Sequence, residues 1–243
     1  HGTHVAGIIG AIRNNATGMD GVADHVKIMI VRAVPDGDER DKDVANSIRY
    51  AVDNGAQIIN MSFGKSYSPF KKVVDDAVLY AESKNVLIVH AAGNEAADND
   101  KEPNFPSALV NGKRVNNWIE VGASDPRGNA ASFSNYGKNS VDLFAPGLQI
   151  YSTLPFNKYG AESGTSMASP VVAGVAALVW SHYPQLSMAQ LKSVLLSSAT
   201  PETTTTIKPG SRKKTVPFNS LSITGGIINA EKAMEAAVKL SSH

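Results

Sequence analysis

Hydrophobic and polar residues along this chain follow two alternating patterns: short apolar runs, and longer stretches with apolar residues three or four positions apart. The apolar runs are rich in β-branched residues and lie at 27–34, 57–63 and 86–92. The stretches with helical spacing lie at 1–12, 43–54 and 69–84. Short β-branched runs predict strands buried in a parallel sheet, and their alternation with helices predicts an α/β domain.

The second half of the chain has three clear helix signals. An almost wholly apolar helix is predicted at 166–183, and Pro170 fits in its first turn, where backbone N–H groups have no partner within the helix. Ser187 begins a capping box, which predicts the start of another helix, and 229–240 predicts a closing amphipathic helix. The stretch 201–220 holds four consecutive threonines, and we expect a surface loop there.

Composition limits the choice of partners. The 243 residues can bury one large core, so a single domain over 1–243 is expected. With 23 basic and 22 acidic residues, the net charge of +1 favours neither nucleic acid nor an anionic membrane. The absence of cysteine excludes disulfides and thiolate metal sites. The longest apolar run, 171–180, is far shorter than the roughly 20 residues that cross a bilayer, so membrane insertion is not expected.

Two motifs at opposite ends of the chain contain candidate catalytic residues. Ser166 lies in Gly-Thr-Ser-Met-Ala-Ser-Pro, and His1 begins His-Gly-Thr-His-Val-Ala-Gly. A serine hydroxyl becomes a good nucleophile when a base takes its proton, and a histidine pKa near 6.5 suits that task. A helix that starts near Ser166 adds a positive dipole end and a free N–H for a developing oxyanion. Asn94, after an apolar strand, has a side-chain amide that can donate to the same oxyanion.

These three motifs, in this order, resemble those of the subtilisin family of serine peptidases (subtilases). The segments 59–64, 144–147 and 225–230 are similar to further segments of that family, so the resemblance covers nearly the whole chain. It implies a doubly wound, mainly parallel β-sheet flanked by helices. It also implies a hydrolase that cleaves peptide bonds through an acyl-enzyme intermediate.

The resemblance further implies a role for each matching residue. Ser166 is the nucleophile, His1 acts as general base and then as general acid, and Asn94 forms the oxyanion hole with the Ser166 N–H. The backbone of Ser62, Phe63 and Gly64 pairs with a polypeptide substrate in extended conformation. Three small residues line the primary specificity pocket, namely Ala91, Ala92 and Gly93.

The family's aspartate precedes its histidine on an earlier strand, and here no residue precedes His1. We therefore expect a domain truncated before the aspartate-bearing strand, with the missing N-terminal segment supplied by the full-length protein. Without that carboxylate the imidazole loses control of its tautomer and orientation, and a subtilisin loses about 3 × 10⁴ in kcat. The expected activity of this chain alone is therefore impaired.

Several features leave more than one interpretation. His4, one turn from His1, could form a metal pair, but a buried and hydrogen-bonded histidine fits better because a third ligand motif is missing. Ala91 and Ala92 favour a broadly tolerant apolar pocket, whereas three acidic residues in the next loop would favour a basic side chain. These acidic residues are Asp98, Asp100 and Glu102.

Three further expectations depend on the resemblance. The turn containing Asn14, Asn15 and Thr17 resembles a family loop that binds structural calcium through oxygen ligands. A secreted or cell-envelope location in a bacterium is expected, although the chain contains no targeting signal. The alternative to an enzyme is a non-catalytic module that keeps the peptide groove without turnover. The presence of Ser166, His1 and Asn94 favours the enzyme, because a binding module does not need all three.

Overall fold

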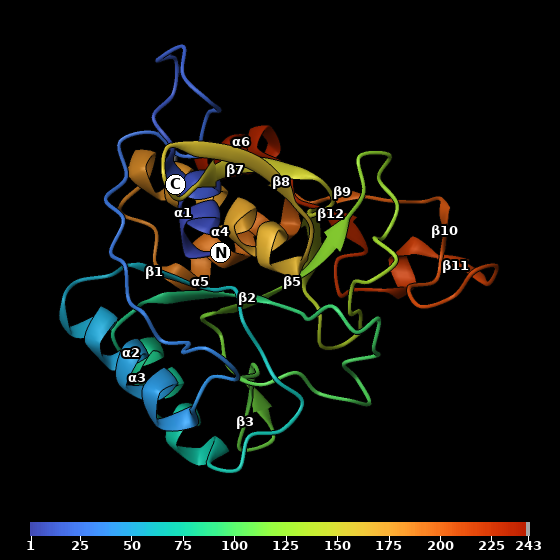
Figure 1. The fold of residues 1–243 in the computed structure, drawn as a ribbon, viewed down its shortest axis with the longest axis horizontal. Helices are drawn as coiled ribbons and strands as arrows, with labels where there is room; N and C mark the ends of the chain where they lie inside the picture. Colours follow the sequence, from blue (N-terminus) through green and yellow to red (C-terminus); the bar gives the residue numbers. More distant parts are fainter. Residues whose placement is uncertain (242–243) are drawn as a thin grey trace.

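A six-stranded sheet organises the computed structural model, which describes residues 1–241 (Figure 1). The strand order is β1-β2-β5-β6-β12-β9, and all neighbours are parallel except the pair β12 and β9. The strands are β1 (Ile58–Met61), β2 (Leu87–Ala91), β5 (Trp118–Ser124), β6 (Leu143–Pro146), β9 (Thr200–Pro201) and β12 (Gly226–Ile227). The expected α/β fold with a mainly parallel sheet is confirmed.

Within residues 1–241 six α-helices accompany the sheet, and most of their ends agree with the sequence pattern. They are α1 (Gly2–Gly10), α2 (Asp41–Asp53), α3 (Lys71–Ser83), α4 (Thr165–His182), α5 (Met188–Ser197) and α6 (Ala230–Ser241). The capping box is present, since the Ser187 side chain accepts from the Gln190 N–H and the Gln190 side chain accepts from the Ser187 N–H. Gly55 follows the end of α2 at φ +85°, a conformation that glycine adopts at little cost.

The sheet is covered on both faces. Leu87 and Val89 of β2 pack into the cluster that contains α4, whereas Ile88 packs into the cluster formed with α2 and α3. Alternate residues of this strand therefore enter different cores, so both sets must be apolar. This explains why the sequence of β2 is a continuous apolar run.

The prediction of a strand at 27–34 is wrong. This segment belongs to no strand of the described structure, and Ile28, Met29 and Ile30 are 40, 41 and 72% exposed. Its residue pattern suits a buried strand, but a strand needs a neighbour to hydrogen-bond with, and neither β1 nor any other described strand pairs with it. Figure 1 shows it as a coil on the way from α1 to α2.

The surface loop predicted at 201–220 is only partly confirmed. The segment contains an antiparallel hairpin of β10 (Thr205–Ile207) and β11 (Thr215–Pro217), followed by a 3₁₀ turn, Phe218–Ser220. Phe218 is fully buried against Phe144, with ring centroids 5.0 Å apart. The described part of the chain has two other hairpins: β3 (Leu109–Val110) with β4 (Lys113–Arg114), and β7 (Ile150–Leu154) with β8 (Lys158–Glu162).

Candidate active site

Ser166 lies in the first turn of α4 and is held against the end of β1. Its Oγ donates to the Ser62 carbonyl oxygen at 3.1 Å, and the Ser62 Oγ donates to the Ser166 carbonyl at 2.9 Å. The backbone N–H of Ser166 has no acceptor within residues 1–241, as expected for a first-turn donor. The first turn of this long buried helix therefore offers both a hydroxyl and a free N–H.

The Asn94 side chain accepts two hydrogen bonds from Thr165, the first residue of α4. Its Oδ1 accepts from the Thr165 N–H at 2.8 Å and from the Thr165 Oγ1 at 3.1 Å, while Thr165 Oγ1 also accepts from the Gly93 N–H at 3.1 Å. Because both bonds use Oδ1, they fix the amide orientation, and the Asn94 Nδ2 has no acceptor in the described part of the chain. Asn94 therefore contacts Thr165, the residue next to Ser166. The two donors expected in the oxyanion hole, Asn94 Nδ2 and the Ser166 N–H, have no hydrogen-bond acceptor within residues 1–241.

The loop that carries Asn94 is supported by a buried amide that the sequence did not single out. Asn135 Oδ1 accepts from the N–H groups of Glu95 and Ala97, each at 2.9 Å, and its Nδ2 donates to the Ala92 carbonyl at 2.9 Å. Gly93, at φ +109°, has no room for a side chain, since an added Cβ would lie 2.3 Å from Asn135 Nδ2. Asn135 therefore sets the turn that presents Asn94.

A second buried network fixes β1 relative to α4. Asn60 Nδ2 donates to Ser62 Oγ at 2.9 Å, and the fully buried Ser169 donates to Asn60 Oδ1 at 2.7 Å. Ser169 lies one turn after Ser166 on the same helix. This network keeps the carbonyl of Ser62 in place beside the Ser166 hydroxyl.

His1 immediately precedes α1, which packs along α4, and Figure 1 shows the amino terminus beside α4. The side chain is exposed, and no hydrogen bond of its imidazole occurs within the described residues. The Ser166 hydroxyl donates to Ser62 rather than to His1. Hydrogen bonds of catalytic groups often tighten only when substrate binds, so the role of His1 stays a prediction.

The hairpin β7–β8 holds α1 in position. Ser152 Oγ and Thr153 Oγ1 donate to the carbonyls of His4 and Thr3, each at 2.8 Å. His4 is fully buried, and its Nε2 lies 3.2 Å from the Gly160 carbonyl. It is the buried, hydrogen-bonded histidine that the sequence favoured over a metal ligand.

The predicted substrate-binding residues form two neighbouring segments. Ser62, Phe63 and Gly64 follow β1, while Ala91 ends β2 and Ala92 and Gly93 continue into the turn of Asn94. Both segments leave the carboxyl ends of neighbouring parallel strands, which meet at one edge of the sheet. The structure therefore collects them beside Ser166, although it holds no substrate.

An ion pair anchors the segment that follows Gly64. Lys65 Nζ lies 2.8 Å from Asp41 Oδ1 at the start of α2, and both side chains are largely buried. Burial opposes ionisation of Asp41, but hydrogen bonds from Lys65, from the Phe70 N–H and from Ser68 hold the pKa of its carboxyl below the usual value. The ionised pair ties the substrate-binding segment to α2.

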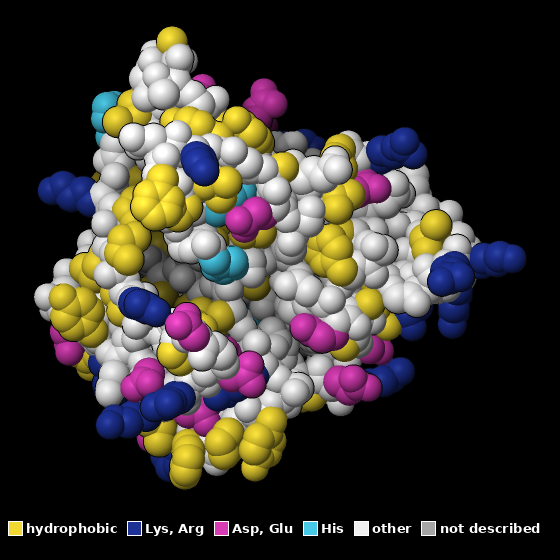
Figure 2. All heavy atoms as spheres, viewed as in Figure 1, with side chains coloured by type: hydrophobic (Ala, Val, Ile, Leu, Met, Phe, Trp, Pro, Cys, Tyr) yellow, Lys and Arg dark blue, Asp and Glu magenta, His cyan; other side chains and the backbone are white. Residues whose placement is uncertain are grey.

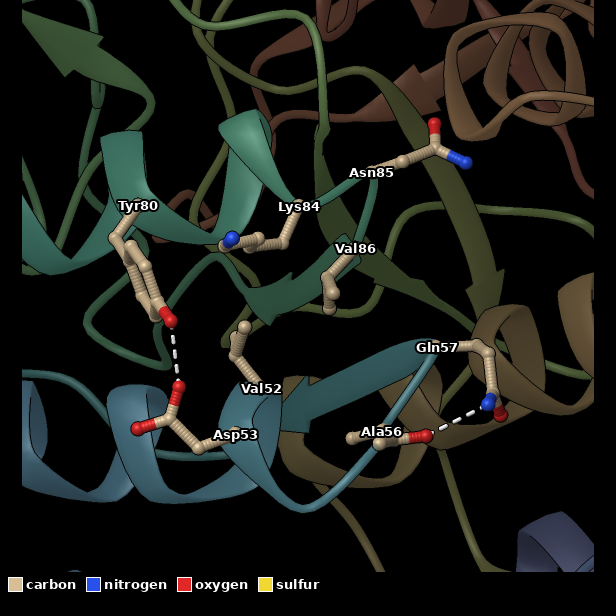
Figure 3. Close-up of a pocket in the computed structure, with 9 residues that line it drawn as sticks. Val52, Asp53, Ala56, Gln57, Tyr80, Lys84, Asn85 and Val86 are labelled. Carbon is tan, nitrogen blue, oxygen red and sulfur yellow. Dashed lines mark hydrogen bonds between the residues drawn. The ribbon is translucent and has the colours of Figure 1, made fainter.

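A cavity of about 440 Å³ lies at the opposite end of the sheet (Figure 3). It is bounded by the C-terminal ends of α2 and α3, where the Tyr80 hydroxyl donates to Asp53 Oδ1 at 2.5 Å. Gln57 and Val86, which line it, precede β1 and β2. None of the predicted site residues lines this cavity, so it is separate from the candidate active site.

Comparison with known proteins points to one family of peptidases. The profile of the subtilase family, peptidase family S8, matches residues 1–221. Thermophilic serine proteinase of Bacillus sp. strain AK1 is 46% identical over 180 residues, which are 74% of this chain and 42% of that protein. Thermitase of Thermoactinomyces vulgaris is 43% identical over 74% of this chain and 60% of its own length. Alkaline elastase YaB of Bacillus sp. strain YaB is 38% identical over 96% of this chain and 54% of its length.

Solved structures have the same fold. A protease from Pseudoalteromonas arctica PAMC 21717 matches with a TM-score of 0.80 at 30% identity, covering 98% of this chain and 70% of that one. A cold adapted subtilisin-like serine proteinase matches with a TM-score of 0.72 at 35% identity, covering 92% and 73%. The chain spans 42 to 60% of the length of the three sequence relatives above. With the family profile matching most of its length, the chain belongs to the subtilase family.

Proposed function

We propose that this chain is the catalytic part of a serine endopeptidase. The observation that carries the proposal is the pair of hydrogen bonds from Thr165 to Asn94 Oδ1. Because these bonds use only Oδ1, they leave Asn94 Nδ2 and the Ser166 N–H as free donors near the Ser166 hydroxyl. Ser166 Oγ attacks the scissile carbonyl carbon, and its proton passes to the His1 imidazole. Asn94 Nδ2 and the Ser166 N–H stabilise the oxyanion. His1 then protonates the leaving amine, and water releases the acyl group by the reverse steps.

The oxyanion role of Asn94 can be tested with a variant that keeps its two hydrogen bonds from Thr165 and removes only the Nδ2 donor. Asn94→Asp retains the Oδ1 acceptor for Thr165 but replaces the Nδ2 donor with oxygen. We expect kcat for a peptide substrate to fall by at least about 10²–10³, the loss seen when a subtilisin loses this donor. Unchanged KM would show that binding survives, and wild-type kcat in Asn94→Asp would exclude the role.

We propose an extended polypeptide as the substrate, pairing with the backbone of Ser62, Phe63 and Gly64. Nucleic acid is not proposed, since the net charge is only +1, and on the face drawn in Figure 2 the Lys and Arg side chains lie in several separate places with Asp and Glu side chains near many of them. A non-catalytic peptide-binding module would bind the same peptide but form no acyl-enzyme. Covalent labelling of Ser166 by a fluorophosphonate therefore separates the two.

We propose that an upstream segment of the full-length protein completes the site. The edge of β1 that faces away from β2 pairs with no described strand, and Ile28, Met29 and Ile30 of the apolar segment 27–34 are exposed. One added strand would satisfy the free backbone groups of β1 and cover part of the apolar segment. A carboxylate on that strand would orient the imidazole of His1, the role that the family resemblance assigns to an aspartate.

We also propose a structural calcium ion at the turn that contains Asn14, Asn15 and Thr17. The turn lines a hollow of about 340 Å³, and its donors are oxygens, which suit a hard cation. Asn15 Oδ1 accepts from the Thr17 N–H at 3.0 Å, and Asp20 Oδ1 accepts from the Asn14 N–H at 3.1 Å, so the turn is already formed. Asp20 adds the carboxylate that such a site needs.

Calcium at 100 times its Kd is expected to raise Tm by about 5–10 °C, because binding to the folded state alone adds about 2.7 kcal/mol. The measurement is a thermal melt in calcium and in excess chelator. Asp20→Asn should abolish most of the difference. Identical melts with calcium and chelator would remove the proposal.

A secreted or cell-envelope location in a bacterium is a further proposal, supported by the bacterial sources of the relatives named above. Within residues 1–241, no helix is both long and apolar enough to cross a membrane.

A further inference from the structure

A fully buried histidine, His90, lies next to the substrate-binding segments and has no part in the proposed reaction. It precedes Ala91 on β2, and its register partner on β5 is Glu120. Side chains alternate between the two faces of a strand, so His90 lies on the same face as Ile88, which packs against α2 and α3. Ser166 belongs to α4 on the other face of the sheet, so His90 can act on the reaction only through its neighbours.

Three rings form a row across this face of the sheet. The rings of Phe63 and His90 meet edge to face, with centroids 6.4 Å apart, and the rings of His90 and Trp118 are tilted, with centroids 5.1 Å apart. Such arrangements are favourable for aromatic rings. Phe63 is the middle residue of the predicted substrate-binding segment and is only partly buried. Contact with His90 therefore supports the Phe63 side chain from inside the protein.

The orientation of the His90 ring is set by Glu120. His90 Nδ1 lies 2.9 Å from Glu120 Oε1, and the Trp118 indole N–H donates to Glu120 Oε2 at 2.6 Å. With the Glu120 carboxylate ionised, both of its oxygens are acceptors and His90 Nδ1 is the donor. The Glu120 N–H donates to Asp142 Oδ2 at 2.7 Å, and Asp142 forms an ion pair with Arg114. The ring therefore cannot turn without breaking a buried hydrogen bond.

Stability alone does not account for this pair. Buried ionisable pairs contribute little compared with apolar side chains of similar volume. His90 Nε2 adds a further cost, because it is buried and has no hydrogen-bond partner within residues 1–241. What Glu120 adds over an apolar neighbour is a single fixed orientation of the ring that supports Phe63.

We propose that His90 is a positioning residue, which holds Phe63 and Gly64 in the conformation that pairs with an extended substrate. It acts through the Phe63 ring, and Glu120 keeps its own ring in place. Ser62 is held separately, by its hydrogen bonds with Ser166 and Asn60. Loss of the His90 ring should therefore weaken peptide binding and leave the chemistry at Ser166 intact. The inference rests on the proposed peptidase function.

The test compares two substrates of the polypeptide extended upstream of His1. A tetrapeptide p-nitroanilide is long enough to pair with Phe63 and Gly64, whereas p-nitrophenyl acetate reacts with the serine hydroxyl and has no residues to pair. His90→Ala combined with Glu120→Gln removes the ring, leaves no unpaired buried carboxylate and keeps an acceptor for Trp118. We expect KM for the tetrapeptide to rise by about tenfold, the effect of losing one hydrogen bond to the substrate, with kcat and ester hydrolysis within about threefold of wild type.

His90→Phe combined with Glu120→Gln is the matched variant, because it restores a ring between Phe63 and Trp118. It should return KM to within about threefold of wild type, on the same tenfold scale. His182→Ala, at the exposed last residue of α4, is the control and should change neither substrate. If the alanine variant does not fold, His90→Leu with Glu120→Gln fills most of the space without a ring, and KM should still rise by at least about threefold.

The outcomes separate this inference from the proposed function. Unchanged KM without the ring, an equal loss for the peptide and the ester, or a loss that phenylalanine does not restore would overturn the role of His90 alone. A wild type that hydrolyses neither substrate would overturn the peptidase function and this inference with it.

Discussion

In the polypeptide extended upstream of His1, Ser166→Ala is expected to lower kcat for peptide hydrolysis by about 10⁶-fold, the loss that follows removal of the nucleophile in a subtilisin. The neighbouring hydroxyls of Thr165 and Ser62 donate to Asn94 Oδ1 and to the Ser166 carbonyl, so neither is expected to replace it. The fold should survive, since the variant loses one hydrogen bond, from Ser166 Oγ to the Ser62 carbonyl, worth about 1 kcal/mol. Steady-state hydrolysis and a thermal melt measure the two effects.

Ser193→Ala is the matched control, because Ser193 is an exposed residue of α5 far along the chain from the site. It should hydrolyse peptides at the wild-type rate. Comparable activity in Ser166→Ala and the wild type, with both proteins folded, would show that the hydrolysis uses another group.

Extending the polypeptide upstream of His1 is expected to raise its rate of peptide hydrolysis by about 10⁴-fold, close to what a subtilisin loses with its aspartate. An added carboxylate would hold one imidazole tautomer and stabilise the imidazolium that forms in the transition state. The added strand would also pair with the free edge of β1. The comparison requires the two forms at equal concentration with the same peptide.

A variant of the extended form separates the carboxylate from the added strand. Replacing that carboxylic acid with its amide should return the rate to that of residues 1–243 while keeping any gain in Tm. Equal rates for the short and extended forms would show that His1 does not depend on an upstream acid.

The helices and the strands β1 and β2 could be predicted because their signals are local. α4 is apolar on nearly every face, and Ser187 starts α5 through a capping box with Gln190. The strand predicted at 27–34 has an equally local signal, yet it has no pairing partner in the described structure. Pairing is a long-range property that a window of apolar residues does not contain.

The residues of the candidate site also differ in whether a local signal in the sequence identifies them. Ser166 and Asn94 could be singled out as candidates because short motifs surround them. The amide of Asn135 and the pair of Asn60 and Ser169 could not, since each acts through contacts between residues 38 to 109 positions apart. An asparagine in a sequence predicts a turn as readily as a buried network, so only the fold identifies such residues.

Mapping a fluorophosphonate adduct by peptide mass spectrometry tests the central claim most directly, namely that Ser166 is a nucleophile activated within one site. The extended polypeptide should form a single adduct, on Ser166, and Asn94→Asp should slow its formation. An adduct on any other residue, or none in the folded and extended protein, would contradict the claim.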